Sequence, residues 1–298
     1  MSKLFDALSK TQGEAASLAL PLIHKAGAAG PGTVRDLPVD APQILPYPGE
    51  VRREHKQFQV EDVPAENLAR VVFHTDPTGT AADRFRLLRM RLREAWTAGK
   101  VKSVLVTSPL PGDGKTITAL NLATALTEER LRKVLLIEAD LHRGHLDQHL
   151  ALSSHIGLAE CLQYGRDPLS AIRRIEPLGW YLLPAGKFTA GSPTELLQPE
   201  ELTALFQRLS SHFDWIIIDS PPVLSVSDAV ALRNHSDCTL LVAKAACTST
   251  KAVEDAIARL GKKHIIGLIL NGIESLQRPY SRYYQYQQRR KLDSSNNL

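Results

Sequence analysis

Residues 103–116 read SVLVTSPLPGDGKT, a short β-branched run that passes directly into a turn with two glycines and a lysine–threonine pair. The run SVLVT predicts a buried strand, and the apolar residues that recur over 117–126 predict a helix after the turn. Gly112 and Gly114 let the backbone curl so that successive N–H groups converge on phosphate oxygens. A strand, a glycine-containing loop and a helix in this order predict a P-loop, the phosphate-binding loop of nucleoside triphosphatases.

The residue types in this loop indicate ATP and Mg²⁺ as its ligands. Lys115 can reach the β- and γ-phosphates, the Thr116 hydroxyl can bind Mg²⁺, and the start of the helix adds its positive dipole end. The loop departs from the common pattern at Pro109, because a glycine usually stands six residues before the lysine. The residues expected to contact ATP are Pro111, Gly112, Asp113, Gly114, Lys115, Thr116 and Ile117.

Carboxylates follow two further predicted strands. Residues 215–218 (WIII) end at Asp219, and residues 133–137 (KVLLI) are followed by Glu138 and Asp140. Ligands of open α/β sheets bind at the carboxyl ends of the strands, so we expect Asp219 to hold a Mg²⁺-bound water opposite Thr116. Glu138 and Asp140 could share the metal and orient a nucleophile. The plainer interpretation of each motif is an acidic residue that ends a strand in a solvated turn. The predicted catalytic residues are Lys115, Glu138, Asp140 and Asp219, and the predicted metal ligands are Thr116, Asp140 and Asp219.

Strands and helices alternate along most of the chain. Further strands are predicted at 238–243 and 265–270, and further helices at 81–96 and 250–260. This pattern predicts an α/β fold of the P-loop NTPase type, with a mostly parallel central sheet and helices on both faces. Residues 30–64 carry six prolines, which remove backbone donors and indicate an extended linker. The predicted division is a short amphipathic segment (1–29), a proline-rich linker (30–75), a catalytic domain (76–275) and a flexible tail (276–298).

Composition excludes several classes of protein. The chain has 298 residues, a formal net charge of +4 and three widely spaced cysteines. An odd number of cysteines without metal-ligand spacing indicates a reducing compartment rather than a disulfide framework. No apolar run approaches the roughly 18 residues that a bilayer-spanning helix needs. We therefore expect a cytoplasmic location.

Together these motifs resemble the bacterial tyrosine kinases (BY-kinases) that accompany capsule and exopolysaccharide export, P-loop proteins related to the ParA and MinD ATPases. PLPGDGKT is similar to the family's loop, whereas ParA and MinD proteins carry a lysine where this chain has Leu110. LLIEADLHRG resembles the family's LLIDxDxR, with Glu138 in place of aspartate and His142 in place of arginine. The segments LPAGKFTAGSPTELL and FDWIIIDSPPVLSVSDA are also similar to kinase segments. By resemblance to the related ATPases, Asn271 at the end of IIGLILN is implied to contact the adenine.

The resemblance implies a function for two further segments, one charged and one rich in tyrosine. DRFRLLR at 83–89 is similar to the family's ExxRxxR motif, which implies that Asp83, Arg86 and Arg89 lie at a subunit interface of a ring. The alternative is a solvated helix face. The tail carries four of the chain's seven tyrosines, and the resemblance implies that they are autophosphorylation sites: Tyr280, Tyr283, Tyr284 and Tyr286.

The resemblance implies an ATP-dependent protein-tyrosine autokinase that phosphorylates its tail in trans and regulates exopolysaccharide or capsule polymerisation and export. It implies a homo-oligomeric ring, a separate transmembrane co-polymerase that activates the kinase at the inner face of the membrane, and a cognate phosphatase, with no nucleic acid expected. Three alternatives stay open. They are a ParA/MinD-like ATPase, a weakly catalytic nucleotide-binding adaptor, and a nucleic-acid binder acting through its aromatic, basic tail.

Overall fold

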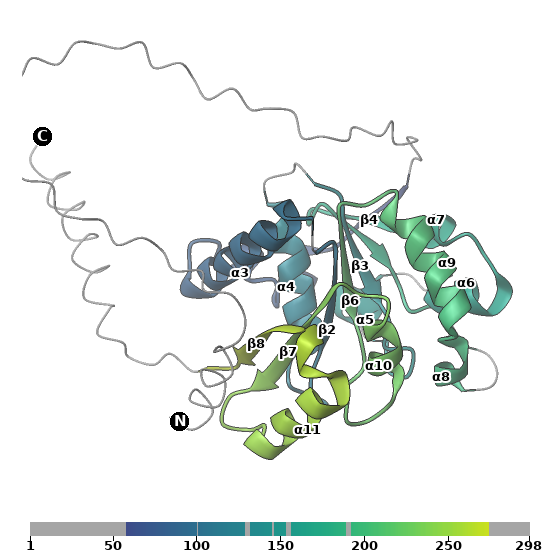
Figure 1. Ribbon diagram of the computed structural model, residues 1–298. Helices are drawn as coiled ribbons and strands as arrows, with labels where there is room; N and C mark the ends of the chain where they lie inside the picture. The colour runs from purple at the N-terminus through teal and green to yellow at the C-terminus, as the bar shows by residue number, and fades with distance from the viewer. Residues whose placement is uncertain are drawn as a thin grey trace, which may run out of the picture. The chain divides into compact units, whose positions relative to one another are not determined.

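The computed structural model describes residues 58–99, 101–128, 132–144, 146–152, 156–188 and 192–273 (Figure 1). The strands of these residues are β1 (Gln59–Asp62), β2 (Ser103–Thr107), β3 (Val134–Glu138), β4 (Arg173–Glu176), β5 (Trp180–Leu183), β6 (Trp215–Asp219), β7 (Cys238–Lys244) and β8 (Ile265–Asn271). The helices are η2 (Ala65–Leu68), α2 (Val72–Thr75), α3 (Thr80–Thr97), α4 (Lys115–Thr127), α5 (Leu146–Leu150), α6 (Leu158–Tyr164), α7 (Pro168–Ala171), α8 (Pro193–Leu196), α9 (Pro199–Ser210), α10 (Asp228–Arg233), α11 (Thr250–Leu260) and η3 (Lys262–His264).

The strands form one sheet in the order β1-β4-β5-β3-β6-β2-β7-β8. All neighbouring strands in this order pair in parallel except β4 and β5, which are antiparallel. The predicted mostly parallel sheet is therefore confirmed, with the antiparallel pair toward one edge. The predicted strands and helices also occur, and most of their ends lie within one residue of the predicted ones.

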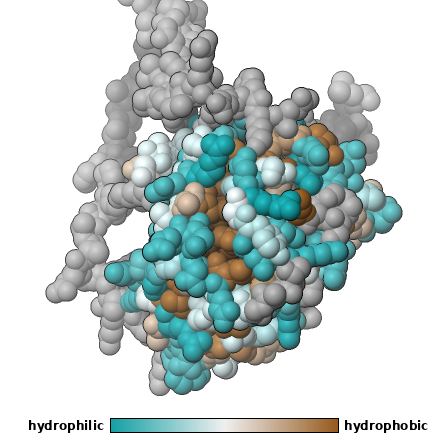
Figure 2. Space-filling model, turned by 90° about the vertical axis from the view of Figure 1, so that its right-hand side faces the viewer, coloured by the Kyte–Doolittle hydropathy of each residue, from teal (hydrophilic) through white to brown (hydrophobic). Residues whose placement is uncertain are grey.

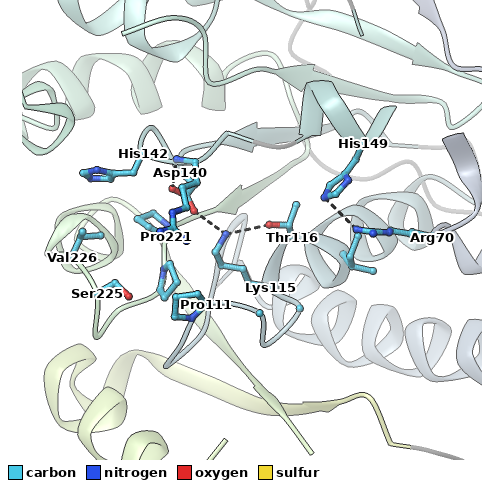
Figure 3. A pocket seen from close by; sticks show the side chains of 15 residues that line it. Arg70, Pro111, Lys115, Thr116, Asp140, His142, His149, Pro221, Ser225 and Val226 are labelled. Atoms are coloured by element: carbon cyan, nitrogen blue, oxygen red, sulfur yellow. Dashed lines mark hydrogen bonds and ion pairs between the residues drawn. The ribbon is translucent and has the colours of Figure 1, made fainter. Parts of the chain in front are cut away.

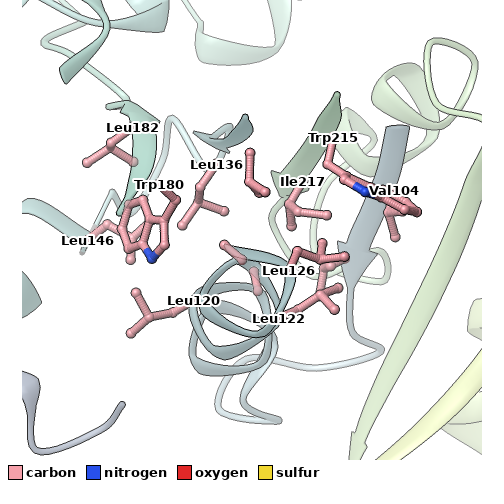
Figure 4. Packing of buried hydrophobic residues seen from close by; sticks show 14 of the residues in the cluster. Val104, Leu120, Leu122, Leu126, Leu136, Leu146, Trp180, Leu182, Trp215 and Ile217 are labelled. Atoms are coloured by element: carbon pink, nitrogen blue, oxygen red, sulfur yellow. The ribbon is translucent and has the colours of Figure 1, made fainter. Parts of the chain in front are cut away.

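Helices cover both faces of the sheet because alternate residues of each strand face opposite sides. Val104 and Val106 of β2 belong to a hydrophobic cluster that includes residues of α3 and α4, whereas Leu105 between them belongs to a second cluster that includes residues of α6, α7 and α9. Figure 4 shows Leu120 and Leu126 of α4 among apolar residues of β3, β5 and β6. The strands are apolar on both sides because both sides are buried, which explains their continuous hydrophobic runs.

The parallel register brings the ends of three strands together beside the P-loop. β2 lies between β6 and β7, and Val106 of β2 is paired with Asp219 of β6. On the other side of β6, Asp219 is paired with Glu138 of β3. The loop after β2 and the carboxylates after β3 and β6 consequently meet at one edge of the sheet.

The folded region begins before the predicted boundary at residue 76. β1, η2 and α2 fall within the segment predicted as a linker, and Val63, Leu68 and Val71 are buried in the core. Five of the six prolines lie before residue 58, outside the described residues, and Pro64 directly precedes η2. The predicted linker extended too far toward the catalytic domain. The prediction relied on the many prolines of this segment, and its three buried apolar residues are too widely spaced to indicate a helix or strand. Residues 1–29 and 276–298 also lie outside the described residues.

No helix in the described ranges is long and apolar enough to cross a bilayer. On the face drawn in Figure 2, hydrophilic residues predominate and a narrow band of hydrophobic residues runs between them.

Candidate functional site

The P-loop connects β2 to α4 and takes its shape from two residues in the left-handed region. Gly112 has φ +84° and Gly114 has φ +97°, values that residues with a Cβ rarely adopt. Asp113 between them is buried and braces the loop. Its Oδ2 accepts a hydrogen bond from the Leu110 amide at 3.0 Å, and its Oδ1 accepts one from the Thr248 hydroxyl at 2.5 Å. The Asp113 carboxylate is thus used within the protein, and the predicted contact of Asp113 with ATP stays a prediction.

Lys115 lies between the two predicted aspartates. Its Nζ is 3.0 Å from Asp140 Oδ2 and 3.7 Å from Asp219 Oδ1, and it donates a hydrogen bond to Thr116 Oγ1 at 3.2 Å. Burial lowers the pKa of Lys115, but attraction by Asp219 and Asp140 outweighs it and leaves that pKa raised. The ammonium is therefore charged and held at the P-loop by both carboxylates, as Figure 3 shows for Asp140.

Asp219 has the properties of a carboxylate that needs a further partner. It is 1% exposed, and burial raises its pKa to about 6 although Lys115 and Thr116 act in the opposite direction. Its Oδ1 makes no hydrogen bond within the described residues. Mg²⁺ prefers oxygen ligands and usually keeps several waters while taking one or two carboxylates. The buried Oδ1 of Asp219, the Asp140 carboxylate and the Thr116 hydroxyl fit such an ion.

Glu138 is held by backbone amides, and its predicted catalytic role stays a prediction. Its Oε1 accepts the Leu146 amide at 2.7 Å and its Oε2 accepts the Ala185 amide at 3.2 Å. Burial raises the pKa of Glu138 to about 8, a hydrogen bond and the charge of Asp147 add to the rise, and the two amides oppose it. The side chain thus joins the end of β3 to the start of α5 and to the loop after β5.

A cavity of about 510 Å³ opens over the P-loop. Among the predicted residues its lining includes Pro111, Gly112, Gly114, Lys115, Thr116, Ile117 and Asp140. The residues of the lining that were not predicted are Arg70, His142, Arg143, His149, Pro221, Pro222, Ser225 and Val226. A sequence signal existed for Pro221 and Pro222, which follow the predicted strand ending at Asp219. Arg70 had none, because it falls in the segment predicted as a linker.

Asn271 lies against the P-loop rather than in this cavity. Its Nδ2 donates a hydrogen bond to the Asp113 carbonyl at 3.0 Å, and a Cβ at Gly114 would lie 1.9 Å from the same nitrogen. The last residue of β8 therefore supports the loop backbone, and glycine at position 114 is needed for space as well as for its φ. The implied contact with adenine stays a prediction.

His142 is held at the mouth of the cavity by a buried acid. Its Nε2 is 3.0 Å from Asp228 Oδ2, and Asp228 is fully buried. The other oxygen of Asp228 accepts a hydrogen bond from the Thr194 hydroxyl at 2.7 Å. His142 thereby joins the loop after β3 to α10 and α8.

The charged residues of the 83–89 motif have partners within the chain. Arg86 donates to both carboxylate oxygens of Glu128 at 2.5–3.1 Å, and Arg89 donates to Glu128 Oε2 at 2.6 Å. Asp83 pairs with Arg86 at 3.1 Å. We call this arrangement the Glu128 clamp. The clamp connects α3 to the end of α4. The ring interface that the resemblance implies stays a prediction. The tail tyrosines lie outside the described residues.

Comparison with known proteins identifies similar sequences and folds. Residues 102–264 match the model of a family described as an AAA domain. The chain is 30% identical over 204 residues to the tyrosine-protein kinase YwqD of Bacillus subtilis, with 68% of this chain and 85% of YwqD covered. It is 30% identical over 221 residues to the tyrosine-protein kinase Wzc of Salmonella typhimurium, with 74% of this chain but only 30% of Wzc covered. The chain thus spans less than a third of the length of Wzc.

The solved kinase domain of the Escherichia coli tyrosine kinase ETK has a similar fold. The TM-score is 0.64 at 28% sequence identity, and the match covers 77% of this chain and 89% of that domain.

Proposed function

Because this chain belongs to the family of bacterial tyrosine-protein kinases, we propose that it is an ATP-dependent autokinase that phosphorylates its own tail tyrosines in trans. The observation that carries the proposal is the position of Lys115, which lies at the P-loop within 3.7 Å of both Asp140 and Asp219. A cation, a hydroxyl and two carboxylates at a phosphate-binding loop suit phosphoryl transfer, in which catalysis is mainly positioning and charge stabilisation.

Each residue of the site has a role in this proposal. The P-loop amides and Lys115 bind the β- and γ-phosphates and stabilise the negative charge of the transferring group. Thr116, Asp140 and Asp219 would hold Mg²⁺, which supplies charge neutralisation at the phosphate oxygens. A bond forms between the tyrosine oxygen and the γ-phosphorus, and the bond from that phosphorus to the bridging oxygen of ADP breaks. Asp140 orients the tyrosine hydroxyl and accepts its proton, and the released ADP carries the leaving electron pair.

The tail supplies the acceptor. Tyr280, Tyr283, Tyr284 and Tyr286 lie within a segment that also carries Arg282, Arg289 and Arg290. Each phosphate would add about −1.5 to −2 charges, so four would reverse the charge of this basic segment. We propose that the unmodified tail enters the site of a neighbouring subunit in a ring formed through Asp83, Arg86 and Arg89. The modified tail would be repelled by the acidic site and would release the ring.

The cellular role follows from the family. We propose that this cycle regulates capsule or exopolysaccharide polymerisation and export, that a separate transmembrane co-polymerase recruits the kinase to the inner face of the membrane and activates it, and that a phosphatase resets the tail.

Phosphosite mapping tests the proposed activity. The full chain is incubated with ATP and Mg²⁺ and its phosphotyrosines are located by mass spectrometry, with Lys115→Met as the inactive control. For transfer in trans, a chain with four Tyr→Phe changes in the tail is mixed with the Lys115→Met chain. We expect phosphate to appear on the tail of the Lys115→Met chain. ATP hydrolysis with an unmodified tail would contradict the proposal and favour a ParA/MinD-like ATPase.

A further inference from the structure

Arg70 lines the cavity over the P-loop although it comes from a segment that precedes α3. It lies between η2 and α2, more than forty residues before Lys115 in the sequence. In Figure 3, Arg70 and His149 lie on one side of Lys115 and Thr116, and His142 lies on the other. One wall of the cavity over the P-loop thus carries a cation, Arg70, that does not come from the P-loop.

The backbone that carries Arg70 is fixed to the P-loop helix. Asn121 of α4 is fully buried, its Oδ1 accepts the Val72 amide at 2.8 Å, and its Nδ2 donates to the Arg70 carbonyl at 2.9 Å. Leu68 and Val71 on either side of Arg70 are buried in the core. The Arg70 carbonyl and the Val72 amide lie on either side of Val71, so this buried amide fixes the backbone that directly follows the Arg70 Cα. Arg70 is therefore positioned relative to the helix that begins at Lys115.

The side chain of Arg70 is oriented by a second contact. Its Nη1 lies 3.3 Å from Nε2 of His149 on α5. Because a guanidinium can only donate, Arg70 is the donor of this contact and His149 Nε2 is the acceptor. This contact uses one of the five N–H donors of the guanidinium, and the others are available to a ligand.

The charge of the cavity suits a polyanion. Among the described residues of its lining, Lys115, Arg143 and Arg70 are cations and Asp140 is the one carboxylate, while Asp219 lies behind Lys115, with its Oδ1 3.7 Å from Nζ. Asp140 is already paired with Lys115 at 3.0 Å. Within the described part of the chain, Arg70 makes no ion pair with a carboxylate, so no described carboxylate neutralises its charge.

We propose that Arg70 binds the phosphate chain of the nucleotide, as a cation supplied by the same chain from outside the P-loop. The inference rests on the proposed binding of ATP and adds a phosphate ligand to it. A guanidinium matches phosphate oxygens with paired, charge-assisted hydrogen bonds that an ammonium forms less well. The segment from η2 to α2 is then part of the nucleotide site, and the site closes on the phosphates from the side opposite His142.

Calorimetric titration of the full chain with ATP, ADP and adenosine, each with Mg²⁺, tests the inference. The variants are Arg70→Ala and Arg70→Lys, with Arg166→Ala as the control because Arg166 is an exposed arginine outside this cavity. We expect Arg70→Ala to weaken ATP and ADP binding about tenfold or more, the effect of losing a charge-assisted hydrogen bond, and to leave adenosine binding unchanged. Arg70→Lys should recover part of the loss, and Arg166→Ala should bind as the native chain does.

The outcomes separate this inference from the proposed function. Equal ATP affinity of the native chain and Arg70→Ala would overturn the role of Arg70 and leave ATP binding intact. An equal loss for adenosine and ATP would also overturn it, because Arg70 would then act on the nucleoside or on the fold. A native chain that did not bind ATP would overturn both. Because Arg70 is exposed, thermal unfolding of Arg70→Ala without nucleotide should match the native chain.

Discussion

His142 Nε2 and Asp228 Oδ2 lie 3.0 Å apart, one residue at the mouth of the nucleotide cavity and the other fully buried behind it. The pair joins the loop that follows β3 to the start of α10. Arginine stands at the position of His142 in the pattern that the sequence resembles, and the shorter histidine is here directed at a protein carboxylate.

Removal of His142 should therefore destabilise the protein. In His142→Ala the Asp228 carboxylate loses the partner of one oxygen, at a cost of about 1–3 kcal/mol. His142→Arg keeps a donor within reach of Asp228 and should lose less. Urea denaturation measures both, with His74→Ala as the control because His74 is exposed. Equal stability of His142→Ala and the native chain would show that the contact contributes nothing.

Glu138 predicts a pH dependence of stability. Burial raises its pKa to about 8 in the folded chain, whereas an unfolded glutamate titrates near about 4.3. Between these values the folded state binds a proton that the unfolded state has released, so the contribution of Glu138 is complete at low pH and is lost as pH rises to about 8. Glu138→Gln resembles the protonated form and should remove this part of the pH dependence.

Denaturation of the native chain and of Glu138→Gln at pH 5, 6.5 and 8.5 checks this prediction. The advantage of the variant should grow with pH. If the stability of both proteins changed with pH by the same amount, the prediction would be wrong. Because the Glu138 carboxylate binds the amides of Leu146 and Ala185, the variant should also keep tail phosphorylation, and loss of that activity would restore the predicted catalytic role.

Asn271 predicts a loss of nucleotide affinity that does not depend on the base. Asn271→Ala removes the hydrogen bond to the Asp113 carbonyl and loosens the P-loop, which should weaken ATP and GTP binding by the same factor of about 3–10. Titration with both nucleotides measures it. A loss confined to ATP would instead support the implied contact with adenine.

The Glu128 clamp predicts a measurable but small coupling between α3 and α4. The side chains of Arg86 and Glu128 are 28% and 32% exposed, so a double-mutant cycle with Arg86→Gln and Glu128→Gln should give about 0.2–1 kcal/mol, decreasing with added salt. The hydrogen bond from Arg86 lowers the pKa of Glu128, so this coupling is present at neutral pH and is lost as pH falls through that lowered value. An additive cycle would show that Arg86 and Glu128 do not stabilise each other.

The fold and the centre of the site could be predicted because they depend on local patterns. Apolar strands that alternate with helices imply a parallel sheet, and parallel strands that end in acids bring those acids to one edge. Lys115, Asp140 and Asp219 therefore meet where the sequence places them. The types of these residues and their positions relative to the strand ends were enough to predict that they lie together.

The other contributions depend on packing between segments that are distant in the sequence. Glu138 differs from Asp140 because the loop after β5 returns with the Ala185 amide, and no pattern in residues 133–140 specifies that return. Arg70 reaches the cavity because Asn121 binds its backbone, 51 residues along the chain. Likewise, Glu128 became the partner of Arg86 only when α3 packed on α4.

The hydrogen bond from Asn271 to the P-loop gives the site a mechanical connection to the tail. Asn271 ends β8, and the chain continues through Gly272 and Ile273 toward Tyr280. Asn271 lies at the end of an edge strand, two residues before Ile273, the last described residue. Under the proposed function, a partner that bound the tail and pulled on this strand end would strain the hydrogen bond to the Asp113 carbonyl and so loosen the proposed phosphate loop. An optical trap that pulls on the tail while a fluorescent ATP analogue reports nucleotide release would measure this coupling.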